Sequence, residues 1–129
     1  MKIEHLALGY NSEKEADKFF INLLGLNKVR TKTVPLDLME AFFKVKRSHT
    51  FIRYRNQFLN FEVFITDDMS KANDSFTHIC LIVENREKFT EKAVSMGYDV
   101  IKVPRKDSPV HYLFIRDSFY NLYEIIEQA

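Results

Sequence analysis

The sequence contains two similar segments, and this internal repeat limits the folds that the chain can adopt. The first reads HLALGYNSEKEADKFFINLLG from His5, and the second reads HICLIVENREKFTEKAVSMG from His78. Each begins with a histidine at an apolar strand, continues through a polar turn into an amphipathic helix, and ends at a glycine. Each copy later closes with an apolar strand that contains one acid, Glu62 in FLNFEVFI and Glu124 in NLYEIIE. The chain therefore predicts two copies of one module.

The apolar patterns indicate the same order of elements in both copies. We expect strands at residues 3–9, 29–34, 51–54 and 59–65 in the first copy and at 78–83, 98–103, 112–115 and 122–127 in the second. The first helix begins at a capping box, Ser12 with Glu15, and the second begins at Asn85. Each copy is thus βαβββ, and the first has an insertion at about residues 35–50, where PLDLMEAFF predicts a short helix.

One such module is too small to cover its own sheet face. We therefore expect an α+β fold in which two βαβββ modules form one curved eight-stranded sheet with the helices outside. The modules span residues 1–66 and 76–129, and the polar run DDMSKANDS, residues 67–75, reads as the linker between them. At 129 residues, the chain is expected to be a single domain.

Composition excludes several classes of partner. The formal net charge is +1 and the charges are mixed along the chain, which argues against binding to nucleic acid or acidic lipid. No apolar run approaches the roughly 18 residues that a membrane span needs. The chain begins directly in a strand, without a basic segment and signal-like core, so a cytoplasmic location is the default expectation. The single cysteine, Cys80, excludes an intrachain disulfide and is interpreted as a small apolar filler on the strand face of His78.

Strand alternation gives the histidines a direction. His5 and Ala7 share one strand face, and Leu6 and Leu8 take the other. If the leucine face meets the helix, both histidines point into the concave side of the sheet. A single strand histidine or glutamate is more often an ordinary polar residue than a ligand. Two histidines and two glutamates at equivalent repeat positions, however, are the residue types that bind a first-row divalent metal.

Several motifs resemble a known family. IEHLAL with LLGL, THICLIV, and the closing FIRDSFYNLYEI look like the repeated signatures of the glyoxalase/bleomycin-resistance/dioxygenase group, also called the vicinal oxygen chelate superfamily. The resemblance covers nearly the whole chain. The closing run departs from the usual Arg-Asp-Pro-Asp-Gly-Asn-Leu, because Ser118 and Tyr120 stand where proline and glycine are common.

The resemblance implies a site and an activity. Carried over by position, it makes His5, Glu62, His78 and Glu124 the ligands of a divalent metal (Ni, Co or Zn), as in bacterial glyoxalase I. It implies a lyase or isomerase that transfers a proton on a metal-chelated α-hydroxycarbonyl or hemithioacetal, similar to lactoylglutathione lyase, with Glu124 as the catalytic proton shuttle. It also implies a homodimer, in which modules pair within one chain or are exchanged between chains.

Two alternatives stay open. The chain is also similar to non-catalytic small-molecule binders of the bleomycin-resistance type, in which case aromatic residues such as Phe42, Phe43, Phe51 and Phe64 would line the cavity. Four further charged residues either hold an anionic group of a substrate or lie on a solvated strand face: Arg47, His49, Arg53 and Arg55.

Overall fold

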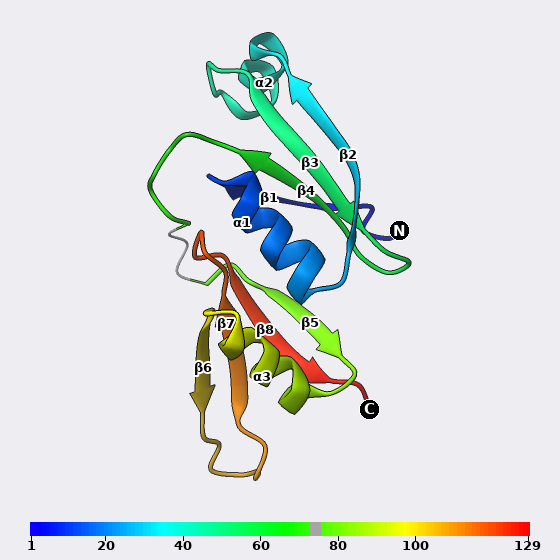
Figure 1. Ribbon diagram of the computed structural model, residues 1–129, viewed down its shortest axis with the longest axis vertical. Coiled ribbons are helices and arrows are strands. Elements are labelled where there is room, and N and C mark those ends of the chain that lie inside the picture. Colours follow the sequence, from blue (N-terminus) through cyan, green and yellow to red (C-terminus); the bar gives the residue numbers. More distant parts are fainter. Residues whose placement is uncertain (73–75) are drawn as a thin grey trace. The chain divides into compact units, whose positions relative to one another are not determined.

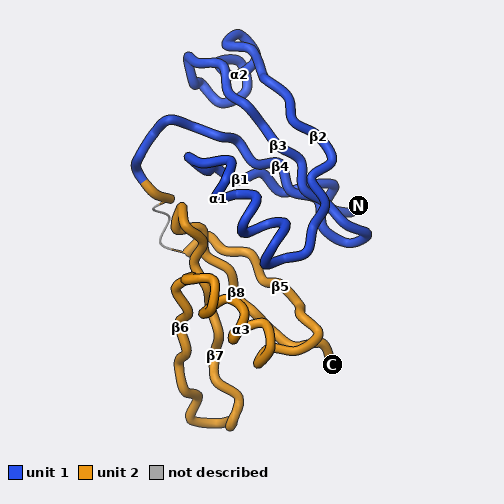
Figure 2. Tube along the Cα trace, viewed as in Figure 1, with its two compact units in different colours: residues 1–70 blue, residues 71–129 orange. Residues whose placement is uncertain are grey.

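The computed structural model describes residues 1–72 and 76–129, and residues 73–75 of the expected linker lie outside the described residues. The chain divides into two compact units, Met1–Ser70 and Lys71–Ala129 (Figure 2). The boundary between the units falls inside the segment that we expected to be a linker. Among the described residues, no helix combines the length and apolarity that crossing a membrane requires.

Unit 1 contains one four-stranded sheet with the strand order β1-β4-β3-β2 (Figure 1). β1 and β4 run parallel, and the other neighbours run antiparallel. Its elements in chain order are β1 (Leu6–Tyr10), α1 (Glu13–Asp17), the π-helix η1 (Lys18–Leu23), β2 (Asn27–Val34), α2 (Leu36–Phe43), β3 (His49–Arg55) and β4 (Asn60–Ile65).

Unit 2 repeats this arrangement, with the strand order β5-β8-β7-β6 and a parallel β5–β8 pair. Its elements are β5 (Ile79–Val83), α3 (Arg86–Ser95), β6 (Asp99–Val103), β7 (Tyr112–Arg116) and β8 (Leu122–Glu127). Both units are therefore βαβββ modules, as the repeat predicts, and α2 is the helix expected in the insertion of unit 1. That the two sheets join into one eight-stranded sheet stays a prediction.

The first helix of each unit has the predicted ends. The Ser12 Oγ accepts a hydrogen bond from the Glu15 amide at 3.2 Å, and the Asn85 Oδ1 accepts one from the Lys88 amide at 2.9 Å. Gly25 and Gly97 follow the helices at φ +75° and +86°, a conformation that glycine adopts without steric cost.

The core of unit 1 is aromatic and lies between the helix and one face of the sheet. The ring of Phe20, on η1, stacks on Tyr54 at 4.9 Å and contacts Phe61 at 5.2 Å and Tyr10 at 5.6 Å, measured between ring centroids. All four side chains are fully buried. Leu6 and Leu8 lie opposite Phe61 and Val63, so the leucine face does meet the helix, which is the condition on which the direction of the histidines depends.

The core of unit 2 is more aliphatic and follows the same plan. Its largest fully buried side chains are Leu113, Ile115, Tyr123 and Ile125, on β7 and β8, and Ala93 of α3 is also fully buried. In each unit, the helix therefore covers one face of the sheet and leaves the opposite face uncovered.

One strand begins later than expected. β1 starts at Leu6 instead of residue 3, and the Ile3 side chain is 78% exposed. His5 therefore lies just before the strand. Its backbone is outside the β1–β4 pairing, and side-chain contacts hold its ring.

Candidate functional site

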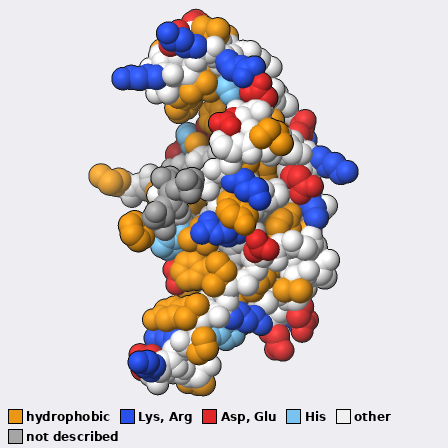
Figure 3. Space-filling view, turned by 90° about the vertical axis from the view of Figure 1, so that its left-hand side faces the viewer, with side chains coloured by type: hydrophobic (Ala, Val, Ile, Leu, Met, Phe, Trp, Pro, Cys, Tyr) orange, Lys and Arg blue, Asp and Glu red, His pale blue; other side chains and the backbone are white. Residues whose placement is uncertain are grey.

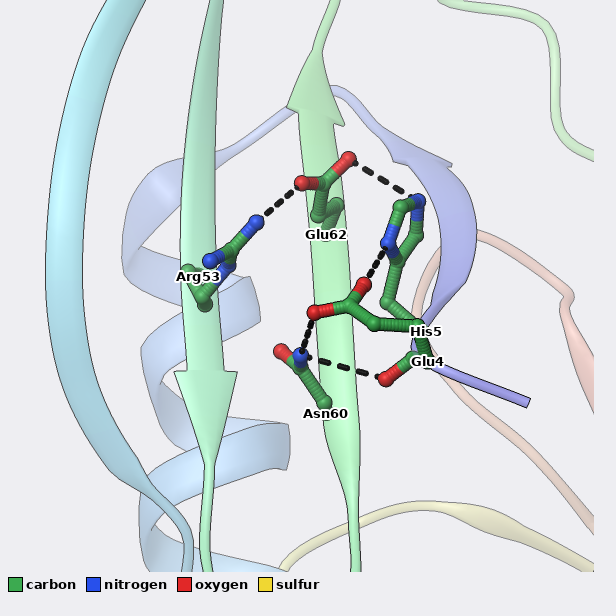
Figure 4. Close-up of polar contacts among 5 residues, drawn as sticks. All are labelled: Glu4, His5, Arg53, Asn60 and Glu62. Atoms are coloured by element: carbon green, nitrogen blue, oxygen red, sulfur yellow. Dashed lines mark hydrogen bonds and ion pairs between the residues drawn. The ribbon is translucent and has the colours of Figure 1, made fainter. Parts of the chain in front are cut away.

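The first His–Glu pair lies on the helix-free face of unit 1. In the parallel β1–β4 pair, Ala7 lies opposite Glu62. His5 precedes Ala7 by two residues, so its side chain falls on the same face as Glu62. Figure 4 shows His5 beside Glu62 with the helix behind the strands. The His5 Nε2 is 3.3 Å from the Glu62 Oε2.

An arginine holds the other oxygen of Glu62. Arg53 lies opposite Glu62 in the β3–β4 register, and its Nη2 donates to the Glu62 Oε1 at 2.5 Å. Only 16% of the Glu62 side chain is exposed. A carboxylate that is this nearly buried needs a partner such as the Arg53 guanidinium, because an unpaired buried charge costs several kcal/mol.

Two further polar side chains orient the His5 ring. The His5 Nδ1 forms a hydrogen bond with the Glu4 carboxylate, and this bond lowers the pKa of Glu4 below its usual value. The Asn60 Nδ2 donates to the carbonyl and the carboxylate of Glu4, both at 3.2 Å (Figure 4). The carboxylate on Nδ1 orients the ring so that the Nε2 atom points at Glu62.

Unit 2 repeats the register of this pair. Cys80 lies opposite Glu124, and His78 precedes Cys80 by two residues. The His78 Nε2 is 3.5 Å from the Glu124 Oε2. The His78 Nδ1 donates to the backbone carbonyl of Phe76 at 2.8 Å, and the ring of Phe114 lies 5.6 Å from the imidazole. Here too, the Nε2 atom points at the glutamate.

The interpretation of Cys80 as a buried filler is wrong. The residue is exposed on the face of the His78–Glu124 pair, because the apolar core of unit 2 lies on the opposite face of β5. Desolvation, and then the charge of Glu124, raise the pKa of the Cys80 thiol above its usual value. The thiol is therefore a neutral but accessible group next to Glu124.

The four predicted ligands thus form two pairs, one in each unit. Within residues 1–72 and 76–129, no group of three or more His, Cys, Asp or Glu side chains is arranged to hold a metal ion. Each pair offers one imidazole nitrogen and one carboxylate oxygen, a donor set that fits a first-row divalent metal. A site with four ligands would need one pair from each unit, and this convergence stays a prediction.

Sequence reasoning did not identify the residues that support the pairs. Glu4 precedes His5 by one residue, and Asn60 precedes Glu62 by two. This spacing was the only sequence signal that could have pointed to either residue. Of the four charged residues left open, only Arg53 contacts a predicted ligand. Arg47 instead forms an ion pair with Asp67, with its nitrogens 2.6 and 2.7 Å from the carboxylate oxygens, and the His49 ring binds the carbonyl of Arg47 at 3.1 Å.

The four phenylalanines proposed for a binding cavity do gather beside Glu62. Phe64 follows Glu62 by two residues on β4 and shares its face, and its ring contacts Phe51 at 5.8 Å and Phe43 at 5.3 Å. Phe42 contacts Phe43 at 6.1 Å. We call this set, Phe42, Phe43, Phe51 and Phe64, the aromatic cluster. The inserted helix α2 supplies half of it.

The closing turn of unit 2 forms despite its unusual sequence. Tyr120, where glycine is common in the resembled family, adopts φ +69°. The buried Asp117 accepts hydrogen bonds from the amides of Phe119 and Asn121 at 3.0 and 2.9 Å and from the hydroxyl of Tyr123 at 2.9 Å. These bonds hold the turn while Tyr120 carries the strain of the left-handed conformation.

Solved structures show what this fold is similar to. No protein-family model matches the chain, and no curated protein matches it by sequence. A glyoxalase family protein from Enterococcus faecalis matches with a TM-score of 0.75 and 15% identity over 96% of this chain and 95% of that chain. The fosfomycin resistance protein FosX from Listeria monocytogenes matches with a TM-score of 0.72 and 13% identity, over 100% of this chain and 94% of that chain. The chain therefore has the glyoxalase-like fold, and the resemblance seen in the sequence is confirmed at the level of fold.

A related structure contains ligands. A mutant of the same FosX, in complex with Mn(II) and 1S,2S-dihydroxypropylphosphonic acid, matches with a TM-score of 0.72 and 14% identity, covering 96% of this chain and 90% of that chain. Proteins with this fold therefore include one that binds a divalent metal together with a small oxygen-rich molecule.

Proposed function

We propose that this protein is a metal-dependent lyase or isomerase that moves a carbon-bound proton. The proposed substrate is a small α-hydroxycarbonyl or hemithioacetal, and the proposed ligands are His5, Glu62, His78 and Glu124. The observation that carries the proposal is the duplicated geometry, in which each unit directs a histidine Nε2 at a glutamate oxygen, at 3.3 and 3.5 Å.

The pairs favour a cation between their members. With Nδ1 engaged as a donor, a neutral imidazole directs a lone pair at the carboxylate, and the two acceptors repel each other. A proton on the ring would relieve this repulsion in one pair at a time. A divalent metal would relieve it in both pairs at once, provided that the pairs come together.

The sheet topology supports one way of bringing the pairs together. Both pairs lie at the β1 or β5 edge of their sheet, on β1–β4 and β5–β8. Sheets joined along these two edges would gather all four ligands on one surface. Joining along β2 and β6 would separate the pairs by more than about 20 Å, given a strand spacing of about 4.8 Å. We propose the first arrangement, either within one chain or between the chains of a homodimer.

The two glutamates have different surroundings, which suggests different roles. Arg53 holds one oxygen of Glu62, so this side chain is fixed. Among the described residues, no Lys or Arg lies within ion-pair distance of Glu124, and 28% of its side chain is exposed. We therefore assign the proton transfer to Glu124, which can turn toward a bound substrate, and a fixed ligand role to Glu62.

A bound divalent metal would polarise the carbonyl and stabilise the negative charge that develops when the proton leaves. The chain's own residues would hold the substrate oxygens beside Glu124 and carry the proton on its carboxylate. Two imidazoles and two carboxylates suit Ni, Co or Zn, as the resemblance implies, and the related FosX structure adds Mn to the metals to be tested. We expect the protein to act in the cytoplasm.

Metal binding can be tested with Cys80 as a reporter. Alkylation of this accessible thiol should slow when Ni, Co, Zn or Mn binds at His78 and Glu124. His5→Ala and His78→Ala should each abolish this protection, whereas His49→Ala and His111→Ala, which remove histidines outside the pairs, should retain it. Equal protection in all four variants would refute the proposed ligands.

Catalysis needs a separate readout. Metal-loaded protein should incorporate solvent deuterium at the reacting carbon of at least one compound from a panel of hemithioacetals, small hydroxycarbonyls and acyl thioesters. A second candidate function, non-catalytic binding of small molecules as in bleomycin-resistance proteins, is favoured by the aromatic cluster. Absence of exchange with every compound, despite bound metal, would support that function instead.

A further inference from the structure

The helix-free face of unit 1 is ordered in rows of side chains that run across the strands. Residues that lie opposite one another in neighbouring strands point to the same face. The row through Glu62 consists of Ala7, Glu62, Arg53 and Arg30, and the next row consists of Gly9, Phe64, Phe51 and Lys32. The first row is thus polar and charged, and the second is largely aromatic.

The aromatic row continues into helix α2, because Phe43 of α2 contacts Phe64 of the row. Phe51 is only 8% exposed, whereas Phe43 and Phe42, which lie above it on the inserted helix, are 50% and 66% exposed. Figure 3 shows hydrophobic side chains among those of lysine and arginine at the top of the view, in the part of unit 1 where α2 lies. Aromatic rings that are left this accessible beside a polar pair are typical of a ligand surface.

The β1 side of this surface carries only small residues. Ala7 lies beside Glu62 and Gly9 lies beside Phe64 along β1. Gly9 has no side chain, so β1 places no side chain on the edge of Phe64 that faces it, whereas the β1-facing oxygen of Glu62 is occupied by His5.

The same face carries an excess of positive charge. Arg53 is engaged with Glu62, but Arg30, Lys32 and Arg55 make no ion pair or hydrogen bond through their side chains in the part of the chain that the structure describes. Four cations on this face stand against two carboxylates, Glu4 and Glu62. The face therefore attracts anions before any metal binds.

We propose that this face selects a small organic anion with a ring-sized apolar group, the ring on the aromatic cluster and the anionic group toward Arg30 and Arg55. Two residues along a strand span about 7 Å, and two strand spacings span about 10 Å. These are the approximate distances from Glu62 to the aromatic row and to Arg30. A monocyclic aromatic acid is of the right size to place its ring on the first and its acid group near the second. The inference rests on the proposed function only for taking the His5–Glu62 pair as part of the metal site.

The test uses the full-length, metal-free protein and three matched probes. They are 4-phenylbutyrate, butyrate, which lacks the ring, and 4-phenylbutan-1-ol, which lacks the charge. Calorimetric or NMR titration should show that 4-phenylbutyrate binds at least about tenfold more tightly than either of the other two. Equal affinity for the three probes would overturn the inference, and it would leave metal binding and deuterium exchange untouched as separate tests of the proposed function.

Variants locate the binding surface. Phe43→Ala and Arg30→Gln should each weaken 4-phenylbutyrate about three- to tenfold, because each removes one of the two complementary groups. Phe58→Ala, at a side chain that is 84% exposed in the β3–β4 turn, and Lys88→Gln, on α3, are the matched controls and should bind as the wild type does. Equal weakening in the controls, or full affinity in both test variants, would show that the probe binds elsewhere and would overturn the assignment.

Discussion

Unit 1 and unit 2 share their strand order and the register of their His–Glu pair, but they support the pair with different groups. In unit 1, the Glu4 carboxylate binds the histidine and Arg53 binds the glutamate. In unit 2, the backbone carbonyl of Phe76 takes the place of Glu4, and Phe114 takes the place of Arg53.

The corresponding register positions make this difference specific. Arg53 and Phe114 lie opposite the two glutamates, and Asn60 and Leu122 both precede a glutamate by two residues. The backbone therefore places a histidine beside a glutamate in the same way in both units, whereas the neighbouring side chains differ in how firmly they hold the glutamate. In unit 1 both oxygens of Glu62 have partners, whereas in unit 2 one oxygen of Glu124 faces His78 and no Lys or Arg of the described residues contacts the other. The comparison indicates a restrained glutamate in unit 1 and a less restrained one in unit 2, which fits the different roles proposed for them.

The largest effect is expected from combining defects in the two units. His5→Ala damages unit 1 and His78→Ala damages unit 2, and each variant alone should have no proton-exchange activity. If sites form between chains, mixing and reassembling the two variants creates dimers with one site that is intact in both units, and about a quarter of the wild-type activity should return. If the units of one chain pair with each other, every site keeps one defect and no activity returns.

The two glutamates should differ next most strongly. Glu124→Gln removes the proposed base, so solvent-deuterium exchange at saturating metal should fall about 10²–10⁴-fold. Glu62→Gln removes a fixed ligand, so it should mainly weaken metal binding, measured by metal titration. A greater loss of exchange in Glu62→Gln than in Glu124→Gln, both at saturating metal, would contradict the division of roles.

The contrast between units also explains how far the sequence could be used for prediction. The βαβββ order, the helix caps at Ser12 and Asn85 and the faces of the strands were predictable, because they follow from local periodicity and capping chemistry. The register that places His5 and His78 two residues before the partner of a glutamate was implied by the repeat, although no local rule specifies it.

The supporting groups were not predictable in the same way. Arg53 reaches Glu62 through the pairing of β3 with β4, and the Phe76 carbonyl has no side-chain signature at all. The interpretation of Cys80 as a small apolar filler rests on the usual burial of free cysteine, yet the strand face that it occupies is the open one. Burial of a strand face depends on which side the helix covers, and that is a property of the whole module.

A smaller effect should follow from giving unit 2 the cation of unit 1. Phe114→Arg places a guanidinium opposite Glu124, as Arg53 lies opposite Glu62, and should restrain the carboxylate. We expect proton exchange to fall about tenfold while the metal content stays unchanged. Phe114→Leu is the matched control, because it also removes the ring beside His78 but adds no charge. Equal loss in both variants would assign the effect to the ring and not to the cation.

The smallest effect concerns the two non-glycine residues with positive φ within residues 1–72 and 76–129, one in each unit. Lys44, at φ +58°, ends α2, and Tyr120, at φ +69°, lies in the β7–β8 turn. Lys44→Gly should raise the free energy of unfolding by about 0.5–1 kcal/mol, since relief of the left-handed strain exceeds the added backbone freedom of glycine in the unfolded chain. Tyr120→Gly should change it by less, because it also removes a ring that lies 4.2 Å from the Lys71 ammonium and 5.3 Å from the Arg116 guanidinium, contacts of about 0.5 kcal/mol each. Urea unfolding measures both values, with Lys44→Ala as the control that keeps the strain. A larger stabilisation from Tyr120→Gly than from Lys44→Gly would mean that the two cations contribute nothing to the turn of unit 2.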